Sequence, residues 1–277
     1  MSSHFQQRPP LLSLVSDRKN NEIKYVCLVC GRVEEEMTTV CSGCTNVHSY
    51  APQEHSGNPN QVHVKRRKAK HAQGIPKKTY VPISTEKPAW DEALGGGLVC
   101  PSTVLVHGPK GTGKTTAMLQ IGAILARKLD GLALYGTAEM GDELLRHYAE
   151  RCRIDLERLL ISDAGEAENL LSDIEEFRPV VVVWDSVQAF TWEGAVGETE
   201  LRNVMRAAIQ ASKVYGMVSL LVSQVTKDND FLGPSELGHN VDVILTLRKK
   251  KEALLVECLE KNRFASTPRI GEEPISG

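Results

Sequence analysis

Several features that define common protein classes are missing from this sequence. No run of apolar residues approaches the roughly 20 residues that a membrane-spanning helix needs. The amino-terminal segment, MSSHFQQRPP, has no apolar region of the kind that marks a secretory signal peptide, so we expect a cytoplasmic protein. No internal repeat is visible along the chain. The sequence therefore argues against membrane, secreted and repeat-built proteins.

A large excess of one charge sign is also absent, but the charges are distributed unevenly. The chain carries 33 Lys and Arg against 35 Asp and Glu, a formal net charge of −2. Residues 1–78 contain 12 basic and 6 acidic residues, for +6, whereas residues 79–277 contain 21 and 29, for −8. A basic front on an acidic body suggests that any polyanion contact uses the front or particular loops.

Cysteine is scarce, yet four of the 7 cysteines form one cluster of two Cys-x-x-Cys pairs separated by ten residues. Each pair can present two thiolates to one side, and two facing pairs make a tetrahedral site that suits Zn²⁺. Two disulfides or four unrelated thiols are the alternative, which fits a cytosolic chain less well at this spacing. The predicted zinc ligands are Cys27, Cys30, Cys41 and Cys44.

The stretch VLVHGPKGTGKTT at residues 104–116 matches the phosphate-binding loop pattern G-x-x-x-x-G-K-[ST], between an apolar run and a helical pattern. Glycines let successive backbone N–H groups point at a phosphate, and the following helix adds a positive dipole end. Lys114 is predicted to neutralise the β- and γ-phosphates of ATP, and Thr115 to bind Mg²⁺. The predicted nucleotide-binding residues are Gly108, Pro109, Lys110, Gly111, Thr112, Gly113, Lys114, Thr115 and Thr116.

Apolar strands alternate with helical patterns from residue 79 onward, which predicts an α/β fold with a mostly parallel sheet covered on both faces. The predicted strands are 104–107, 132–135, 159–161, 180–184, 217–223, 241–247 and 253–260, with a basic turn at 248–251. The predicted helices are a short one around Trp90, followed by 114–128, 141–152, 165–177 and 198–215.

Polar residues follow several predicted strands at their carboxyl ends, where such sheets bind ligands. Asp185 follows the run VVVVW, a Walker B arrangement in which a buried strand delivers one carboxylate to Mg²⁺. Glu139 follows a strand that we expect beside the phosphate-loop strand, and it is predicted to polarise the attacking water. Gln224 ends another strand and is a candidate sensor of the γ-phosphate, with an ordinary loop glutamine as the alternative.

The chain thus divides into four predicted segments. Residues 1–22 are polar and are predicted to be a disordered amino terminus. Residues 23–50 form the predicted zinc finger, and residues 51–78 a flexible basic linker. The basic run at 65–70 in that linker fits a solvated tether at least as well as a nucleic-acid contact. Residues 79–277 form the predicted ATPase domain.

The order of these motifs resembles the bacterial DNA repair RadA (Sms) family, which belongs to the wider RecA/DnaB-like ATPases. The resemblance covers roughly residues 23–277, and the stretch Lys-Asn-Arg-Phe at 261–264 is specific to that family. The segments that carry the resemblance are the four-cysteine module, IST at 83–85, LGGGL at 94–98, the phosphate loop, Glu139, Asp185-Ser186, VTK at 225–227 and KNRF at 261–264.

This resemblance implies a RecA-like core and an ATP-dependent helicase or translocase on single-stranded or branched DNA, working with a recombinase and without a membrane. Relatives form rings, hexamers among them, with ATP between subunits. Lys261 and Arg263 are then expected to reach a neighbour's γ-phosphate, like an arginine finger acting in trans. Lys227 is expected to contact DNA. Relatives continue into a Lon-protease-like domain, which we do not expect in a chain that stops at Gly277.

Three functions remain compatible with the sequence. The first is a DNA-stimulated ATPase of recombination and repair, favoured by the cysteine module and by residues 261–264. The second is a RecA-fold signalling or clock-type switch with protein partners, for which the acidic body leaves room. The third is an adaptor that only binds nucleotide, and the presence of both Glu139 and Asp185 argues against it.

Overall fold

The computed structural model describes residues 25–27, 32–34, 50–52, 72–74, 79–163, 165–224, 238 and 240–274. In the amino-terminal part, β1 (Tyr25–Cys27), β2 (Val33–Glu34) and β3 (Tyr50–Pro52) pair antiparallel in the order β2-β1-β3. A short 3-10 helix, η1 (Ala72–Gly74), lies within the segment predicted as a linker. Of the four predicted zinc ligands, only the backbone of Cys27 falls within the described residues, and Lys227 also falls outside them.

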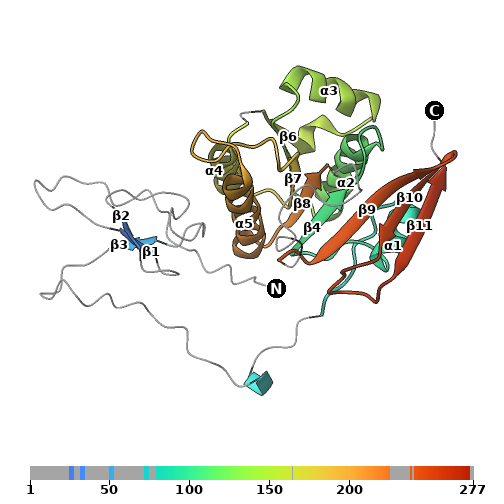
Figure 1. The fold of residues 1–277 in the computed structure, drawn as a ribbon, viewed down its shortest axis with the longest axis horizontal. Helices are drawn as coiled ribbons and strands as arrows, with labels where there is room; N and C mark the ends of the chain where they lie inside the picture. Colours follow the sequence, from blue (N-terminus) through green and yellow to red (C-terminus); the bar gives the residue numbers. More distant parts are fainter. Residues whose placement is uncertain are drawn as a thin grey trace, which may run out of the picture.

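One large sheet of eight strands, in the order β11-β10-β9-β4-β8-β7-β5-β6, organises the rest of the described chain (Figure 1). Strands β4 to β9 are mutually parallel, and β10 and β11 join by antiparallel pairing. This confirms the predicted α/β fold with a mostly parallel sheet. The strands are β4 (Ser102–His107), β5 (Ala133–Thr137), β6 (Leu159–Ser162), β7 (Val181–Asp185), β8 (Val218–Ser223), β9 (Val243–Lys250), β10 (Ala253–Cys258) and β11 (Arg269–Pro274).

Helices cover both faces of this sheet because side chains alternate between the two faces along each strand. In β4, for example, Val104 and Val106 join the core that includes α1, α2 and α3, whereas Leu105 joins the core that includes α4 and α5 (Figure 1). The helices are α1 (Pro88–Leu94), α2 (Lys114–Lys128), α3 (Asp142–Arg151), the 3-10 helix η2 (Leu156–Arg158), α4 (Ala167–Phe177) and α5 (Glu198–Tyr215).

Two expectations about the sheet were wrong, and one strand was not predicted. The strand that precedes Glu139 is β5, and β8 and β7 lie between it and β4, so the two strands are not neighbours. The basic stretch predicted as a turn at 248–251 mostly continues β9, which runs through Lys250. The sequence RIGEEP at 269–274 was not predicted as a strand because only one aliphatic side chain marks it, yet it pairs along all of β10 as β11.

Within the described residues, no helix combines the length and the apolar character needed to cross a bilayer.

Candidate nucleotide-binding site

The phosphate loop connects the carboxyl end of β4 to the amino end of α2, which begins at Lys114. Gly111 and Gly113 adopt φ angles of +75° and +83°, and a Cβ built on either would meet nothing within 4 Å. Glycine is therefore needed at these two positions for backbone conformation rather than for space. Gly108 differs, because a Cβ there would lie 2.6 Å from the carbonyl oxygen of Leu247 on β9.

The ammonium group of Lys114 lies against this loop. Its Nζ donates hydrogen bonds to the carbonyl oxygens of Gly108, at 2.6 Å, and of Pro109, at 2.9 Å. Partial burial lowers the pKa of Lys114, and the negative charges of Asp185 and Glu139 oppose that effect. The loop thus holds a cation in the place where a P-loop binds phosphate.

The carboxylate of Asp185, at the end of β7, is the anionic centre of the site and is only 7% exposed. Its Oδ2 accepts hydrogen bonds from Thr115 Oγ1, at 2.9 Å, and from the Tyr135 hydroxyl, at 2.5 Å. Burial raises the pKa of Asp185, while these two hydrogen bonds act in the opposite direction. Burial also raises the pKa of Tyr135 well above its usual value, so the phenol remains a donor.

Thr115 and Asp185 together fit the requirements of Mg²⁺. This ion prefers oxygen ligands and keeps several waters, so one carboxylate, one hydroxyl and the oxygens of a bound phosphate suffice to hold it. The 2.9 Å contact between Thr115 Oγ1 and Asp185 Oδ2 places the two protein oxygens side by side. Across the described residues, no group of three or more His, Cys, Asp or Glu side chains could hold a metal.

Glu139 reaches the same edge of the sheet despite the two strands that separate β5 from β4. Its Oε1 accepts hydrogen bonds from Ser186 Oγ, at 2.5 Å, and from Gln224 Nε2, at 3.1 Å. The residues predicted from the ends of β5, β7 and β8 are thus brought together. Sequence reasoning missed Tyr135, whose contact with Asp185 depends on the pairing of β5 with β7, and it gave Ser186 no role.

Lys261 and Arg263 lie at the amino ends of the parallel strands, whereas the phosphate loop lies at their carboxyl ends. The backbone N–H of Ile244 donates to the carbonyl of Lys261, and that of Arg263 donates to the carbonyl of Asp242, both at 3.0 Å. These contacts place the pair beside the amino end of β9, which runs parallel to β4. Because the phosphate loop follows the carboxyl end of β4, about 15 Å of strand separates the two regions.

Asn262 shapes the turn that carries these two cations. Its Oδ1 accepts hydrogen bonds from the backbone N–H groups of Phe264 and Ala265, and its Nδ2 donates to the carbonyl of Leu94 at 3.0 Å. The turn packs closely on the glycine segment after α1, since a Cβ on Gly95 would lie 2.5 Å from the Cβ of Ala265. Two motifs distant in sequence therefore form one structural unit.

The side chains of the two cations differ in their surroundings. Arg263 forms an ion pair with Asp242 at 2.9 Å and is still 51% exposed. Lys261 Nζ lies 3.3 Å from the carbonyl oxygen of Gly238, and partial burial lowers the pKa of its ammonium group. The Arg263 side chain is thus accessible at the surface of the described chain.

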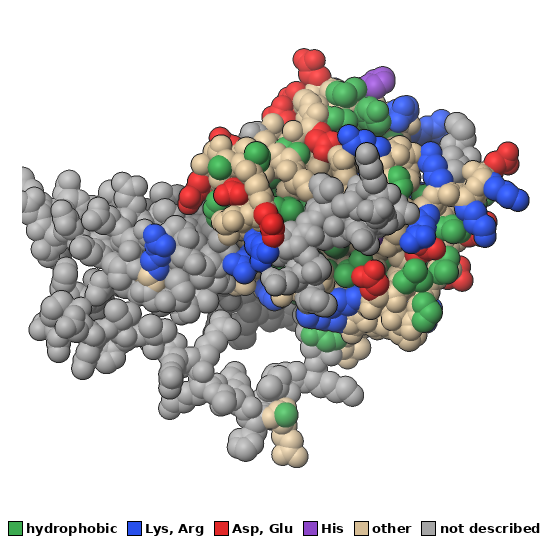
Figure 2. Space-filling model, viewed as in Figure 1, with side chains coloured by type: hydrophobic (Ala, Val, Ile, Leu, Met, Phe, Trp, Pro, Cys, Tyr) green, Lys and Arg blue, Asp and Glu red, His purple; other side chains and the backbone are tan. Residues whose placement is uncertain are grey.

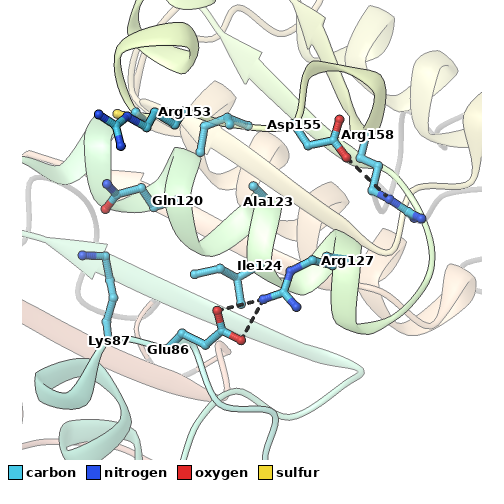
Figure 3. Close-up of a pocket in the computed structure, with 11 residues that line it drawn as sticks. Glu86, Lys87, Gln120, Ala123, Ile124, Arg127, Arg153, Asp155 and Arg158 are labelled. Carbon is cyan, nitrogen blue, oxygen red and sulfur yellow. Dashed lines mark hydrogen bonds and ion pairs between the residues drawn. The ribbon is translucent and has the colours of Figure 1, made fainter.

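A cavity of about 510 Å³ lies on the outer side of α2, away from the phosphate loop, Asp185 and Glu139 (Figure 3). Its floor includes Ala123 and Ile124, and two pairs, Glu86 with Arg127 and Asp155 with Arg158, lie at its sides. None of the residues predicted from the sequence to bind nucleotide, metal or DNA lines it.

The sequence is similar to known P-loop proteins over the region that contains this site. A family model described as an AAA domain matches residues 83–230. DNA repair protein RadA of Mycobacterium tuberculosis (strain ATCC 25618 / H37Rv) is 31% identical over 255 residues, covering 88% of this chain and 50% of the relative. DNA repair protein RadA of Listeria monocytogenes (serovar 1/2a, strain EGD-e) is 28% identical over 264 residues, covering 90% and 56%. That of Streptococcus pyogenes serotype M1 is 27% identical over 258 residues, covering 89% and 56%.

The chain therefore spans about half the length of the curated relatives that it matches. The matched AAA region contains the phosphate loop, Glu139, Asp185 and Gln224, and the relatives extend the similarity over most of the chain. Because the family model covers more than half of the sequence, this chain belongs to the AAA domain family of P-loop proteins and is RadA-like.

Proposed function

We propose that this protein hydrolyses ATP and uses the energy to act on single-stranded or branched DNA in recombination and repair. The observation that carries the proposal is the convergence of Lys114, Thr115, Asp185 and Glu139 at one edge of the sheet. P-loop ATPases need this set, namely a cation, two oxygen ligands for Mg²⁺ and a carboxylate near the attacking water. The DNA component rests on the similarity to DNA repair proteins.

Each residue has a distinct role in this proposal. The loop amides and Lys114 bind the β- and γ-phosphates, which fixes the substrate for in-line attack. Thr115 and Asp185 hold Mg²⁺, which neutralises charge on the phosphate oxygens. Glu139 orients the attacking water and accepts its proton. Gln224 senses the γ-phosphate, a role supported by its hydrogen bond to Glu139 at 3.1 Å.

The active form in this proposal is a ring, with a hexamer as the expected size, in which each ATP lies between two subunits. Lys261 and Arg263 cannot serve the phosphate loop of their own chain, because they lie at the other edge of the sheet. A neighbouring subunit can present them to the γ-phosphate, where a planar guanidinium stabilises developing charge.

The direct test measures ATP turnover with and without single-stranded DNA. We expect turnover that depends on Mg²⁺ and rises when DNA is added. Turnover that DNA does not change would favour the alternative, a signalling or clock-type switch that acts on protein partners. Absence of turnover with intact ATP binding would leave an adaptor and overturn the proposal.

The amino-terminal cysteines and the segment that follows β8 also have roles in the proposal. In this proposal a zinc finger is built from Cys27, Cys30, Cys41 and Cys44, and zinc binding supplies the free energy that folds it. Lys227 contacts the phosphate backbone of DNA. A recombinase is the proposed protein partner. Elemental analysis of the reduced protein should give about one zinc per chain. A protein that contains no zinc would exclude the zinc finger but would leave the proposed ATP hydrolysis untouched.

The substitution Tyr135→Phe is expected to raise the Mg²⁺ concentration that supports half-maximal turnover by about tenfold. The Tyr135 hydroxyl donates to Asp185 Oδ2, so its loss frees the carboxylate to rotate and removes a hydrogen bond that lowers its pKa. Steady-state kinetics over a Mg²⁺ titration measures the effect. Tyr148→Phe on α3, whose ring contacts Arg151 outside the site, is the matched control. Equal Mg²⁺ requirements in both variants would exclude Tyr135 from positioning Asp185.

A further inference from the structure

The hairpin formed by β9 and β10 ends in an uninterrupted row of four basic residues, Arg248 to Lys251. Its register pairs Lys249 with Leu254 and Lys250 with Ala253, so the turn consists of Lys251 and Glu252. Lys251 adopts a φ of +56° in that turn. Figure 2 shows Lys and Arg side chains gathered at the end of the molecule where β9 and β10 meet in Figure 1.

The charges on this hairpin are not balanced within the described chain. Arg248 is held by an ion pair with Glu257, at 2.9 Å, from the facing strand. Lys249, Lys250 and Lys251 are exposed, and their side chains make no ion pair or hydrogen bond with any described residue. As successive residues of β9, Lys249 and Lys250 point to opposite faces of the hairpin, and Lys251 lies in the turn, so three cations surround the tip and attract a polyanion that contacts it.

The hairpin tip lies at the same edge of the sheet as the phosphate loop. Strands β4 and β9 run parallel, with His107 opposite Thr246, and the close approach of Gly108 to the Leu247 carbonyl puts β9 directly against the loop. Residues 248–251 continue beyond that contact. The cationic tip therefore projects beside the nucleotide-binding site rather than at a remote part of the surface.

We infer that Lys249, Lys250 and Lys251 form a binding site for the phosphate backbone of DNA, next to the nucleotide site. The inference rests on the proposed action on DNA and adds a contact outside the segment that carries Lys227. A protein partner is less suited to the tip, because protein interfaces rely on buried aromatic or aliphatic anchors and residues 248–252 contain none. The same lack of aromatic rings means that the tip contacts phosphates and does not stack on bases.

The test compares the salt dependence of DNA binding between the full chain and the triple variant Lys249→Ala, Lys250→Ala, Lys251→Asn. Asparagine is chosen at 251 because it tolerates a positive φ. Binding of a fluorescein-labelled single strand is followed by anisotropy at several salt concentrations. Loss of three phosphate contacts should reduce the slope of log K against log salt by about 2. Between roughly 50 and 200 mM salt, the wild type should then lose about 16-fold more affinity than the variant.

The matched control removes three exposed cations elsewhere, through Arg153→Asn just after α3, at a φ of +56°, and Arg206→Ala and Lys213→Ala on α5. This variant has the same net charge as the hairpin variant, so a general loss of attraction would change both slopes equally. Arg248 is left in place in the hairpin variant, since its ion pair with Glu257 joins the two strands. Thermal melting of both variants verifies that the fold is retained.

The outcomes separate this inference from the proposed function. If the wild type binds DNA and the hairpin variant keeps the wild-type slope, the inference is overturned and the proposed function stands. A hairpin variant that instead loses ATP affinity, measured with a fluorescent ATP analogue, would assign the cations to the nucleotide and also overturn it. A wild type that binds no DNA at all would overturn both. A reduced slope in the hairpin variant alone supports the DNA site.

Discussion

Replacing Lys114 by alanine is expected to lower kcat/KM for ATP hydrolysis by about a hundredfold or more, as removal of a single preorganised donor to a developing charge does in other enzymes. The Lys114 ammonium already lies in the loop, 2.6 Å from the carbonyl oxygen of Gly108. Partial burial makes its charge effective, because nearby protein screens it less than bulk water does. Steady-state turnover and calorimetric titration with ATP in the presence of Mg²⁺ measure the loss.

The same loop supplies a matched control for this experiment. Lys110 lies four residues earlier in the phosphate loop and is expected to bind phosphate through its backbone N–H, because its side chain is exposed and makes no hydrogen bond within the described chain. Lys110→Ala removes an equal charge from the same segment, and we expect it to change kcat/KM by no more than about threefold. Equal losses in the two variants would mean that net charge, and not the position of Lys114, governs the reaction.

The sequence was most informative where local rules decide the structure. The helix predicted at 114–128 coincides with α2, because Gly113 takes a left-handed φ and the helical spacing of apolar residues begins directly after it. The position of Asp185 at the end of a strand was predicted because a run of buried residues in β7 ends at a single carboxylate. In both cases the signal lies within one short segment of the chain.

The sequence was least informative where pairing between distant segments decides the structure. Nothing in residues 132–137 indicates that β7 and β8 lie between this strand and β4, the strand that leads into the phosphate loop. The contacts of Glu139 with Ser186 and Gln224 depend on that strand order and could not be derived without it. Tyr135 was missed for the same reason, since its hydroxyl matters only because β5 pairs with β7 and so lies beside Asp185.

Arg263→Ala is expected to lower turnover at least as much as Lys114→Ala, although the two residues lie at opposite ends of the parallel strands in one chain. The proposed reason is that Arg263 completes the site of a neighbour, where an arginine supplied in trans contributes about 10³-fold or more to the rate. The side chain of Arg263 is 51% exposed, which permits such a contact. Loss of activity alone would not distinguish this role from a structural one, because Arg263 also pairs with Asp242.

Mixing two inactive variants separates these explanations. When Lys114→Ala and Arg263→Ala subunits are combined in equal amounts, some interfaces join an intact phosphate loop from one variant to an intact Arg263 from the other. Random assembly in a head-to-tail ring makes about a quarter of all interfaces complete in this way. Turnover should therefore recover to about that fraction of the wild-type rate. Two variants whose defects merely unfold the subunit would show no recovery.

The decisive control combines Lys114→Ala with Asp185→Asn. Both residues belong to the same edge of the same subunit, where Asp185 accepts a hydrogen bond from Thr115, directly after Lys114. Every subunit in this mixture carries one defect in its own nucleotide site, so no interface can be complete and no activity should return. Recovery in the first mixture but not in the second requires that a site be built from two chains. No recovery in either mixture would exclude Arg263 as a residue acting in trans and leave it as the partner of Asp242 within one fold.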